Sequence, residues 1–342
     1  MIPFIPLLLG GASVLAAAHG VKKGVEAKED MDLAKYINEQ AQKICKEADA
    51  SITNHKESTT KSIESLGAKK VELLSHSVND FVTNFGKIRN IDPQNSIGMD
   101  ELRHFNPKSP EFLQLKKISF EAADVAVNGI TSLGSGALLA LGTYNVVMGG
   151  LGGLLVTATT GTALSSLTGV AATNATLAWL GGGALSVGGL GMAGGMAVLG
   201  GIVAGPALAL GGSLFAAKAE KAYYAARENQ DKAKEYQEEA NSINATLDAI
   251  KSRADQMNNL LGRLNAPLNI LNAKMKSIIN SSGTDWRYYT PTEKNQIYKC
   301  VQTASAIKKL LDTSLLHEDG SLNQASAGEI ASSQRFLNQL NV

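Results

Sequence analysis

The chain has 342 residues, and its 32 basic and 31 acidic side chains give a formal net charge of +1 at pH 7. This balance argues against a nucleic-acid-binding protein, which normally carries a basic surface. The two cysteines, Cys45 and Cys300, lie far apart and match no metal-binding or disulfide pattern, so we expect two free thiols, with a structural disulfide as the alternative.

The chain begins with an apolar arm, in which Ile2–Ala18 carries no charged side chain and Lys22 and Lys23 follow. A secretory signal carries its positive charge before the apolar run, not after it. The arm is close to the shortest stretch that spans a bilayer, and the lysines behind it favour an outside amino terminus. We interpret residues 1–22 as a membrane anchor, with a buried hydrophobic arm as the alternative.

Residues 23–89 are predicted to form one long amphipathic helix. Apolar residues recur at helical spacing from Ile37 to Ile88, whereas the other faces carry Lys, Glu, Ser and Asn. Such a stripe needs a partner helix. Residues 90–110 contain three prolines and many turn-forming residues, which predicts a linker, and a helix is expected to resume near Pro110.

The stretch from Val125 to Ala217 has no Asp, Glu, Lys, Arg or His over 93 residues, and it holds 23 of the 34 glycines. In water, glycine in a helix interior costs roughly 1 kcal/mol relative to alanine. In a bilayer, small residues instead let helix backbones approach closely. We interpret residues 111–217 as a hydrophobic membrane region. The alternative is a buried soluble hairpin that inserts only when triggered.

Small residues recur every four positions in this region, which places them in one groove along a helix face. We expect helices to associate through this groove. Four aromatic residues lie near the ends of possible spans, and we interpret them as interfacial anchors or as packing residues. They are Tyr144, Trp179, Tyr223 and Tyr224. The predicted membrane and oligomerisation residues are Gly189, Ala193, Ala197, Gly201, Gly205 and Ala209, the shorter pair Gly149 and Gly153, and Trp179.

The region is long enough for two to four crossings at about 20 residues each. Both flanks are basic, with Lys116 and Lys117 before it and Lys218, Lys221 and Arg227 after it. The positive-inside tendency places both flanks on one side of the membrane. We therefore expect an even number of crossings, two or four.

A second long helix is predicted over residues 218–265, where a seven-residue repeat is clear. Sustained heptads are typical of a coiled coil, and alanine allows close approach of a neighbouring helix. We expect the first helix to fold back against it as an antiparallel partner, and pairing between molecules is the alternative. The two heptad positions hold Ala219, Ala226, Ala233, Ala240, Leu247, Ala254 and Leu261, and Ala222, Asn229, Tyr236, Ile243, Ile250, Met257 and Leu264.

Residues 266–342 are predicted to form shorter helices. One covers Pro267–Ile279, and the last lies near Ala327–Leu340. Another begins at Thr290, which can form a capping box with Glu293. No alternating strand pattern is present, so the predicted class is all-α. The predicted architecture is an elongated antiparallel coiled-coil bundle with a central glycine-rich membrane region.

The segment TNATLAWLGGGALSVGGLGMAGGMAVLGGIVAGPALALGG resembles a glycine-zipper segment that recurs in bacterial proteins. It is also loosely similar to the glycine-rich apolar region of interferon-induced small membrane proteins. These resemblances imply a bacterial origin and membrane association. The order of long helix, apolar insert and long helix resembles, in architecture alone, α-helical pore-forming toxins of the cytolysin A and haemolysin BL type. That resemblance implies insertion into a membrane.

The sequence lacks the patterns of common catalytic sites. It has no GxxxxGK[ST] phosphate loop, its GxGxxG match has no preceding strand, and its five histidines show no metal-ligand spacing. We therefore expect no enzyme activity, cofactor or metal.

The predicted function is membrane insertion and oligomerisation that permeabilise a bilayer, by a bacterial protein of the inner membrane or a secreted one. Its expected partners are the bilayer and further copies of the chain, with or without a partner protein. The alternative is a membrane-anchored coiled-coil scaffold that recruits proteins without forming a pore.

Overall fold

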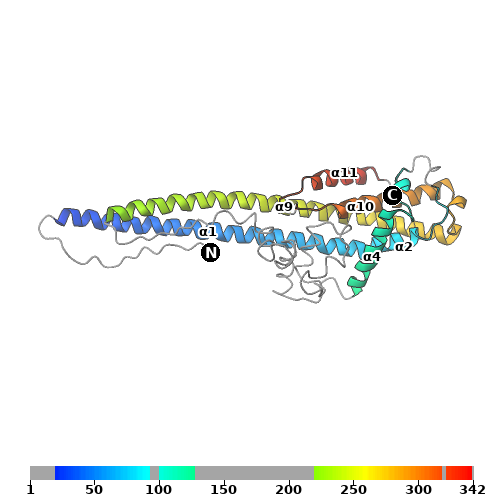
Figure 1. Cartoon of the computed structure of the whole chain (residues 1–342), viewed down its shortest axis with the longest axis horizontal. Coiled ribbons are helices and arrows are strands. Elements are labelled where there is room, and N and C mark those ends of the chain that lie inside the picture. The colour runs from blue at the N-terminus through cyan, green and yellow to red at the C-terminus, as the bar shows by residue number, and fades with distance from the viewer. Residues whose placement is uncertain (1–19, 93–99, 128–218, 318–320, 341–342) are drawn as a thin grey trace, which may run out of the picture. The chain divides into compact units, whose positions relative to one another are not determined.

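The computed structural model describes residues 20–92, 100–127, 219–317 and 321–340 (Figure 1). These residues are mostly helical, and the only strand-like pairing among them is two isolated bridges, so the predicted all-α class is confirmed for this part of the chain. The chain divides into two compact units. The first unit is Met1–Glu57 with Ile202–Asp248, and the second unit is Ser58–Gly201 with Ala249–Val342.

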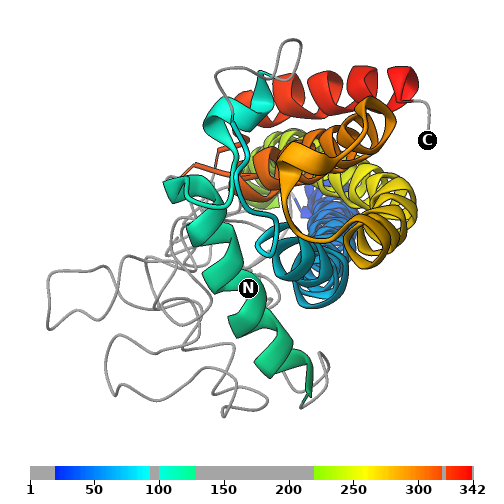
Figure 2. The ribbon, with the colours of Figure 1, turned by 90° about the vertical axis from the view of Figure 1, so that its right-hand side faces the viewer.

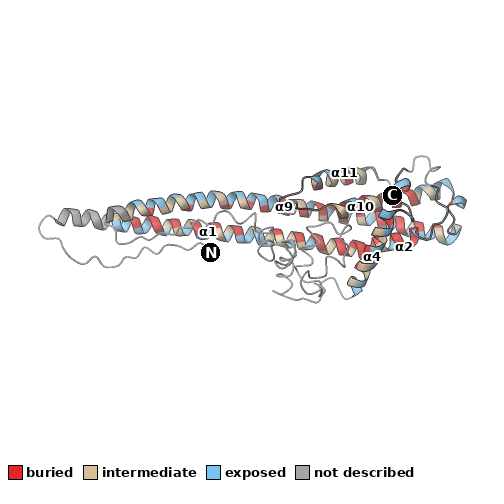
Figure 3. Ribbon diagram, viewed as in Figure 1, coloured by how far each residue is buried: buried red, intermediate tan, exposed pale blue. Residues whose placement is uncertain are grey.

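Two long helices, α1 (Gly20–Leu73) and α9 (Ala219–Ser282), contribute to both units. In the first unit they pack side by side through three small clusters of buried residues, and Figure 3 shows buried positions recurring along both helices. Each step of seven residues along α1 matches a step of seven along α9. The clusters are Ala34, Ile37 and Ala226; Ala41, Cys45 and Ala233; and Ala48, Ile52 and Ala240.

Residue numbers rise together along this interface, so α1 and α9 run parallel and the predicted antiparallel pairing is wrong. The prediction treated the apolar region as the turn of a hairpin. The connection between Leu73 and Ala219 is long, however, and it allows the chain to return to the end of the first unit at which α1 begins. A long connection therefore permits either direction, and the side-chain contacts decide between them.

The heptad positions predicted along α9 do face its partner. The first set is buried from Ala226 to Leu261, and the second set is buried at Ile250, Met257 and Leu264. Nearer the start of the helix, the second set is only partly buried, as at Tyr236 and Ile243. The repeat is therefore used for pairing within one molecule.

The break predicted before Pro267 is absent, because α9 continues through this residue to Ser282. Proline removes one amide donor and disturbs the preceding turn, which weakens a helix locally. Leu264 and Leu268, on either side of it, are fully buried. Their packing offsets the lost hydrogen bond. Helix α9 ends instead at Ser282, before Gly283, whose φ of 79° is the left-handed conformation that glycine adopts readily.

The second unit adds the remaining helices to the later parts of α1 and α9. They are η1 (Leu74–Val78, a π-helix), α2 (Asn79–Phe85), α3 (Glu101–His104), α4 (Pro110–Val127), η5 (Trp286–Tyr288), α10 (Pro291–Asp312) and α11 (Ala325–Gln339). Helix α4 packs on η1 and α2, and α10 packs on α11 and α3 (Figure 2). Two arginines of α9 donate hydrogen bonds to α11, from Arg253 Nη1 to Ser326 Oγ and from Arg263 Nη1 to Gln334 Oε1.

Four phenylalanines hold α4 in place. Phe81 stacks on Phe85 with 5.2 Å between ring centroids, and Phe112 of α4 meets both rings edge-on at 6.3 and 5.7 Å. Phe105, from the predicted linker, stacks on Phe81 at 6.0 Å. The linker is thus partly a core element, and it contains α3 with its buried Leu102. Its apolar residues are too few to form a periodic pattern, so the sequence did not predict that the linker contributes to the core.

The helix boundaries that depend on local chemistry were predictable. A helix begins at Pro110, as expected, and Thr290 forms the predicted capping box with Glu293 at the start of α10. The Thr290 side chain accepts from the Glu293 amide, and the Glu293 carboxylate accepts from the Thr290 amide at 2.8 Å.

Candidate functional site

The residues predicted to carry membrane insertion and oligomerisation lie outside the described residues. The same holds for the apolar arm up to residue 19. The residues concerned are Gly149, Gly153, Trp179, Gly189, Ala193, Ala197, Gly201, Gly205 and Ala209.

Within the described ranges, none of the helices has both the length and the apolar character needed to cross a bilayer. The same ranges contain no group of three or more His, Cys, Asp or Glu side chains placed to hold a metal ion.

Polar side chains join α1 to α9 between the alanines of the first unit. Asn229 Nδ2 donates to Asn38 Oδ1 at 2.9 Å, and Asn244 Nδ2 donates to Ser51 Oγ at 2.8 Å. The two pairs are separated by 191 and 193 residues in the chain, a nearly constant offset that only a parallel pair gives. Buried amide groups cost free energy unless they are paired, so these contacts favour one register.

Tyr236 adds a further contact, because its hydroxyl donates to the Asp49 carboxylate. Burial, and then this hydrogen bond to a carboxylate, raise the pKa of Tyr236. Tyr236 therefore stays a neutral donor throughout the physiological range. Nearby, His55 Nε2 lies 3.5 Å from Asp248 Oδ2, where the pair is half exposed.

A row of asparagines continues on α9 in the second unit at seven-residue spacing. Asn258 Nδ2 donates to Ser65 Oγ at 3.0 Å, Asn265 Oδ1 accepts from Ser77 Oγ at 2.5 Å, and Asn272 Nδ2 donates to the Ser77 carbonyl at 2.8 Å. All three partners lie on α1 or on η1, which follows it. The parallel direction is therefore held by polar contacts in the second unit as well.

The core of the second unit contains a cluster of charged groups. Lys70 of α1 is fully buried, and this desolvation lowers its pKa to about 7, against the opposing pull of the Asp312 carboxylate. Asp312 Oδ2 accepts from Lys308 Nζ at 2.5 Å, while Asp312 Oδ1 is buried without a hydrogen-bond partner in the described structure. Burial raises the pKa of Asp312, although both lysines oppose this effect.

Sequence reasoning missed this cluster. Lys70 lies in a helix rich in lysine, and only its position among apolar residues such as Leu66 and Leu73 could have indicated burial. Groups with a strongly shifted pKa often belong to functional sites. Lys70 is closed to solvent, however, so the cluster acts first on the stability of the second unit.

Cys45 and Cys300 are free thiols, as predicted, and both are buried. Burial raises the pKa of each thiol, and for Cys45 the nearby Asp49 adds to the effect. A raised pKa keeps a thiol protonated and unreactive.

The two tyrosines near the start of α9 have different environments. Tyr223 packs against the cluster around Ala226 and accepts a hydrogen bond from Arg227 Nε at 3.1 Å, so it is a packing residue. Tyr224 is 64% exposed. Leu33 and Tyr36 of α1 are also exposed. The exposed large hydrophobic residues described in the first unit therefore neighbour, in sequence, the buried cluster of Ala34, Ile37 and Ala226.

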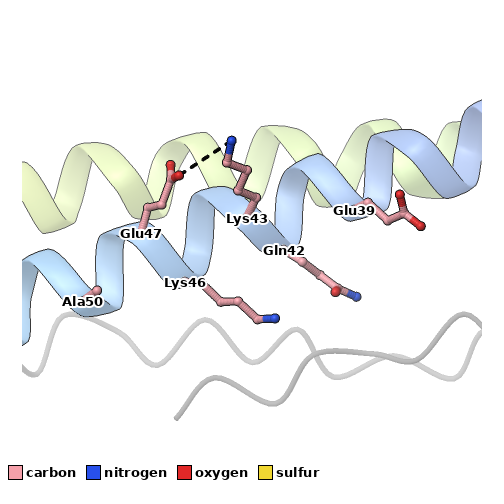
Figure 4. Close-up of a pocket in the computed structure, with 6 residues that line it drawn as sticks. All are labelled: Glu39, Gln42, Lys43, Lys46, Glu47 and Ala50. Carbon is pink, nitrogen blue, oxygen red and sulfur yellow. Dashed lines mark ion pairs between the residues drawn. The ribbon is translucent and has the colours of Figure 1, made fainter.

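Six residues of α1 line a shallow surface hollow (Figure 4). In it, Lys43 Nζ lies 3.9 Å from Glu47 Oε1, and both side chains are more than half exposed. An exposed ion pair of this kind contributes little to stability and creates no specific ligand site. We regard the hollow as a solvated helix face. Its residues are Glu39, Gln42, Lys43, Lys46, Glu47 and Ala50.

The outer face of α4 is the most exposed apolar surface in the described part of the second unit. Leu113, Phe120 and Val127 lie on it, and Lys116 Nζ is 6.0 Å from the centroid of the Phe120 ring. The seven-residue spacing of these three residues was a signal in the sequence that our predictions did not use.

No family model, curated protein or solved structure matches this chain.

Proposed function

We propose that this protein inserts its uncharged stretch, residues 125–217, into a lipid bilayer, oligomerises there through its small-residue groove, and thereby permeabilises the membrane. The observation that carries the proposal is the composition of that stretch, which lacks every charged residue and holds 23 of the chain's 34 glycines. Such a composition is costly in water and useful where helices must pack closely in lipid.

The helix pair supports this proposal indirectly. The heptad positions of α9 are used up by contacts with α1 in the same molecule, as at Ala226, Ala233 and Ala240. Another part of the chain must therefore mediate the association between copies. The groove from Gly189 to Ala209 has the spacing that suits it.

The scaffold alternative loses support from the same contacts. A coiled coil that recruits partner helices needs exposed apolar heptad positions. On α9, the buried heptad positions already pack against α1 of the same molecule. A scaffold would have to recruit its partners through another surface.

Two experiments on the expressed full chain test the proposal. The first is membrane fractionation with a carbonate wash, and the second measures the release of a trapped dye from liposomes. We expect the protein to resist the carbonate wash and to release the dye in a concentration-dependent manner. Tight binding without dye release would favour the scaffold. Recovery of all the protein in the carbonate supernatant, together with intact liposomes, would refute membrane insertion.

A further inference from the structure

Helix α4 has two apolar faces, and the core uses only one of them. The inner face packs through Phe112 against Phe81 and Phe85. On the outer face, Leu113, Phe120 and Val127 are 52, 45 and 86% exposed. Residues seven apart lie almost above one another on a helix, so these three form a continuous outer stripe.

Lysines border the outer stripe. Lys116 Nζ lies 6.0 Å from the centroid of the Phe120 ring, and Lys117, whose side chain is 76% exposed, reaches Glu121 Oε1 at 4.0 Å. Two acidic residues share this side of the helix: Asp124, which is one turn from both Phe120 and Val127, and Glu121, the partner of Lys117. Apolar side chains bordered by lysines are typical of helices that lie in the plane of a membrane surface, because lysine stems extend along the apolar layer and place their charge among the headgroups.

The position of α4 in the chain identifies what would cover the outer stripe. Its last turn, from Val125 to Val127, already belongs to the uncharged stretch that we propose to insert into the bilayer. Of the three stripe residues, the most exposed is Val127, which itself belongs to the uncharged stretch. The stripe therefore continues directly into the segment proposed to enter lipid.

We infer that α4 lies in the surface layer of the bilayer with its outer stripe toward the lipid, so that it docks the second unit on the membrane where the chain enters it. This inference rests on the proposed function and adds the surface through which the described structure meets the membrane. The phenylalanine contacts of the inner face hold α4 to the second unit, so docking of one docks the other.

An environment-sensitive fluorophore attached to single introduced cysteines tests this arrangement in the full chain. The test variants are Leu113→Cys and Phe120→Cys, and Glu111→Cys, an exposed position off the stripe, is the matched control. The native Cys45 and Cys300 are buried, so wild-type protein taken through the same labelling serves as the blank. The probe is vesicles of phosphatidylcholine, with and without phosphatidylglycerol, that contain a lipid carrying a nitroxide quencher just below the headgroup.

When the protein binds vesicles, we expect the fluorescence emission of the labels at positions 113 and 120 to shift to shorter wavelength and to be quenched severalfold by the nitroxide lipid. The emission of the label at position 111 should change little. Binding measured by co-sedimentation without these changes would overturn the docking of α4 and leave the proposed function standing. Labels that are already blue-shifted without vesicles would overturn it too, because the stripe would then be covered by the uncharged stretch or by a second copy. Failure to bind vesicles at all would overturn both proposals.

Discussion

At the level of single residues, the polar contacts between α1 and α9 set the direction of the pair. The alanines of the two helices repeat every seven residues, so they would match in either direction. The asparagines match in only one, since Asn229 meets Asn38 and Asn244 meets Ser51 in the parallel register. An antiparallel pair would separate these groups and lose both hydrogen bonds, which would add to the two amide atoms, Asn38 Nδ2 and Asn244 Oδ1, that are buried without a partner among the described residues in the parallel register.

Gly262 in α9 and Gly283, the residue that follows the helix, are expected to respond in opposite ways to substitution by alanine. At Gly262, in the helix interior, an added Cβ meets nothing within 4 Å, so Gly262→Ala should stabilise the fold by up to about 1 kcal/mol. At Gly283 there is equal space, but φ is 79°, so Gly283→Ala should destabilise it by about 1 kcal/mol or more. Urea unfolding followed by circular dichroism measures both. Shifts of the same sign would contradict the role given to the backbone at Gly283.

Lys70 makes stability depend on pH. Burial lowers the pKa of Lys70 from 10.5 to about 7, so the unfolded chain binds more protons than the folded chain between these values. Stability should therefore rise with pH across that window, and the cost of charging Lys70 is fully present below pH 7. Each pKa unit corresponds to about 1.4 kcal/mol.

Replacing this buried lysine tests that cost. Lys70→Met should be more stable than the wild type at pH 7, by a few kcal/mol at most, and the difference should shrink toward pH 10 because the wild type gains stability there. Asp312 keeps its contact with Lys308 in the variant. Lys69→Met, which alters a partly exposed lysine paired with Glu72, is the control and should show no such trend. A stability difference that stays constant from pH 7 to 10 would argue against a neutral buried Lys70.

At the level of elements, the parallel helix pair is the central feature of the first unit. Small side chains at Ala34, Ala41 and Ala48 face small side chains on α9, which allows the two backbones to approach closely. The π-helix η1 and α2 continue the course of α1, where α4 packs on them. The alanine contacts of the first unit are therefore made by α1 itself, and the aromatic contacts of the second unit by α2, which follows it in the chain.

Disulfide crosslinking tests the direction of the pair. In a Cys45→Ala background, cysteines at the facing positions Ala34 and Ala226 should form an intramolecular disulfide on mild oxidation. The crossed pair, cysteines at Ala34 and Ala240, would be close only in an antiparallel arrangement and should stay reduced. Mobility on non-reducing gels reads out both. Efficient crosslinking of the crossed pair alone would show that the parallel register is incorrect.

At the level of the whole molecule, the parallel pair places the starts of α1 and α9 at the same end of the first unit. The apolar arm precedes one of these starts, and the uncharged stretch precedes the other. The apolar arm and the later end of the uncharged stretch therefore join the described structure at the same end of that unit, whereas the earlier end of the stretch follows α4 in the second unit. An antiparallel pair would have separated them by the length of the unit.

Oligomer formation is expected to depend on the glycines of the small-residue groove. Gly201→Leu or Gly205→Leu should abolish oligomers, because a large side chain holds helix backbones apart, while the pairing of α1 with α9 is unaffected. Crosslinking of the protein in detergent measures assembly, and circular dichroism measures the helices. Val203→Leu, which lies on another face of the same predicted helix, should assemble normally. Oligomers that persist in both glycine variants would rule out the groove as the contact.

The sequence by itself determined the helical class, the buried heptad positions of α9 and the capping box at Thr290, because each depends on residues within a few turns of one another. The direction of the helix pair, the burial of Lys70 and the division of α4 into an inner and an outer apolar face were decided only by the tertiary structure. These features depend on contacts between residues far apart in the chain, such as Asn38 and Asn229, 191 residues apart. Local periodicity shows that a helix face will be covered, but the partner and its direction follow from which polar groups can be satisfied together.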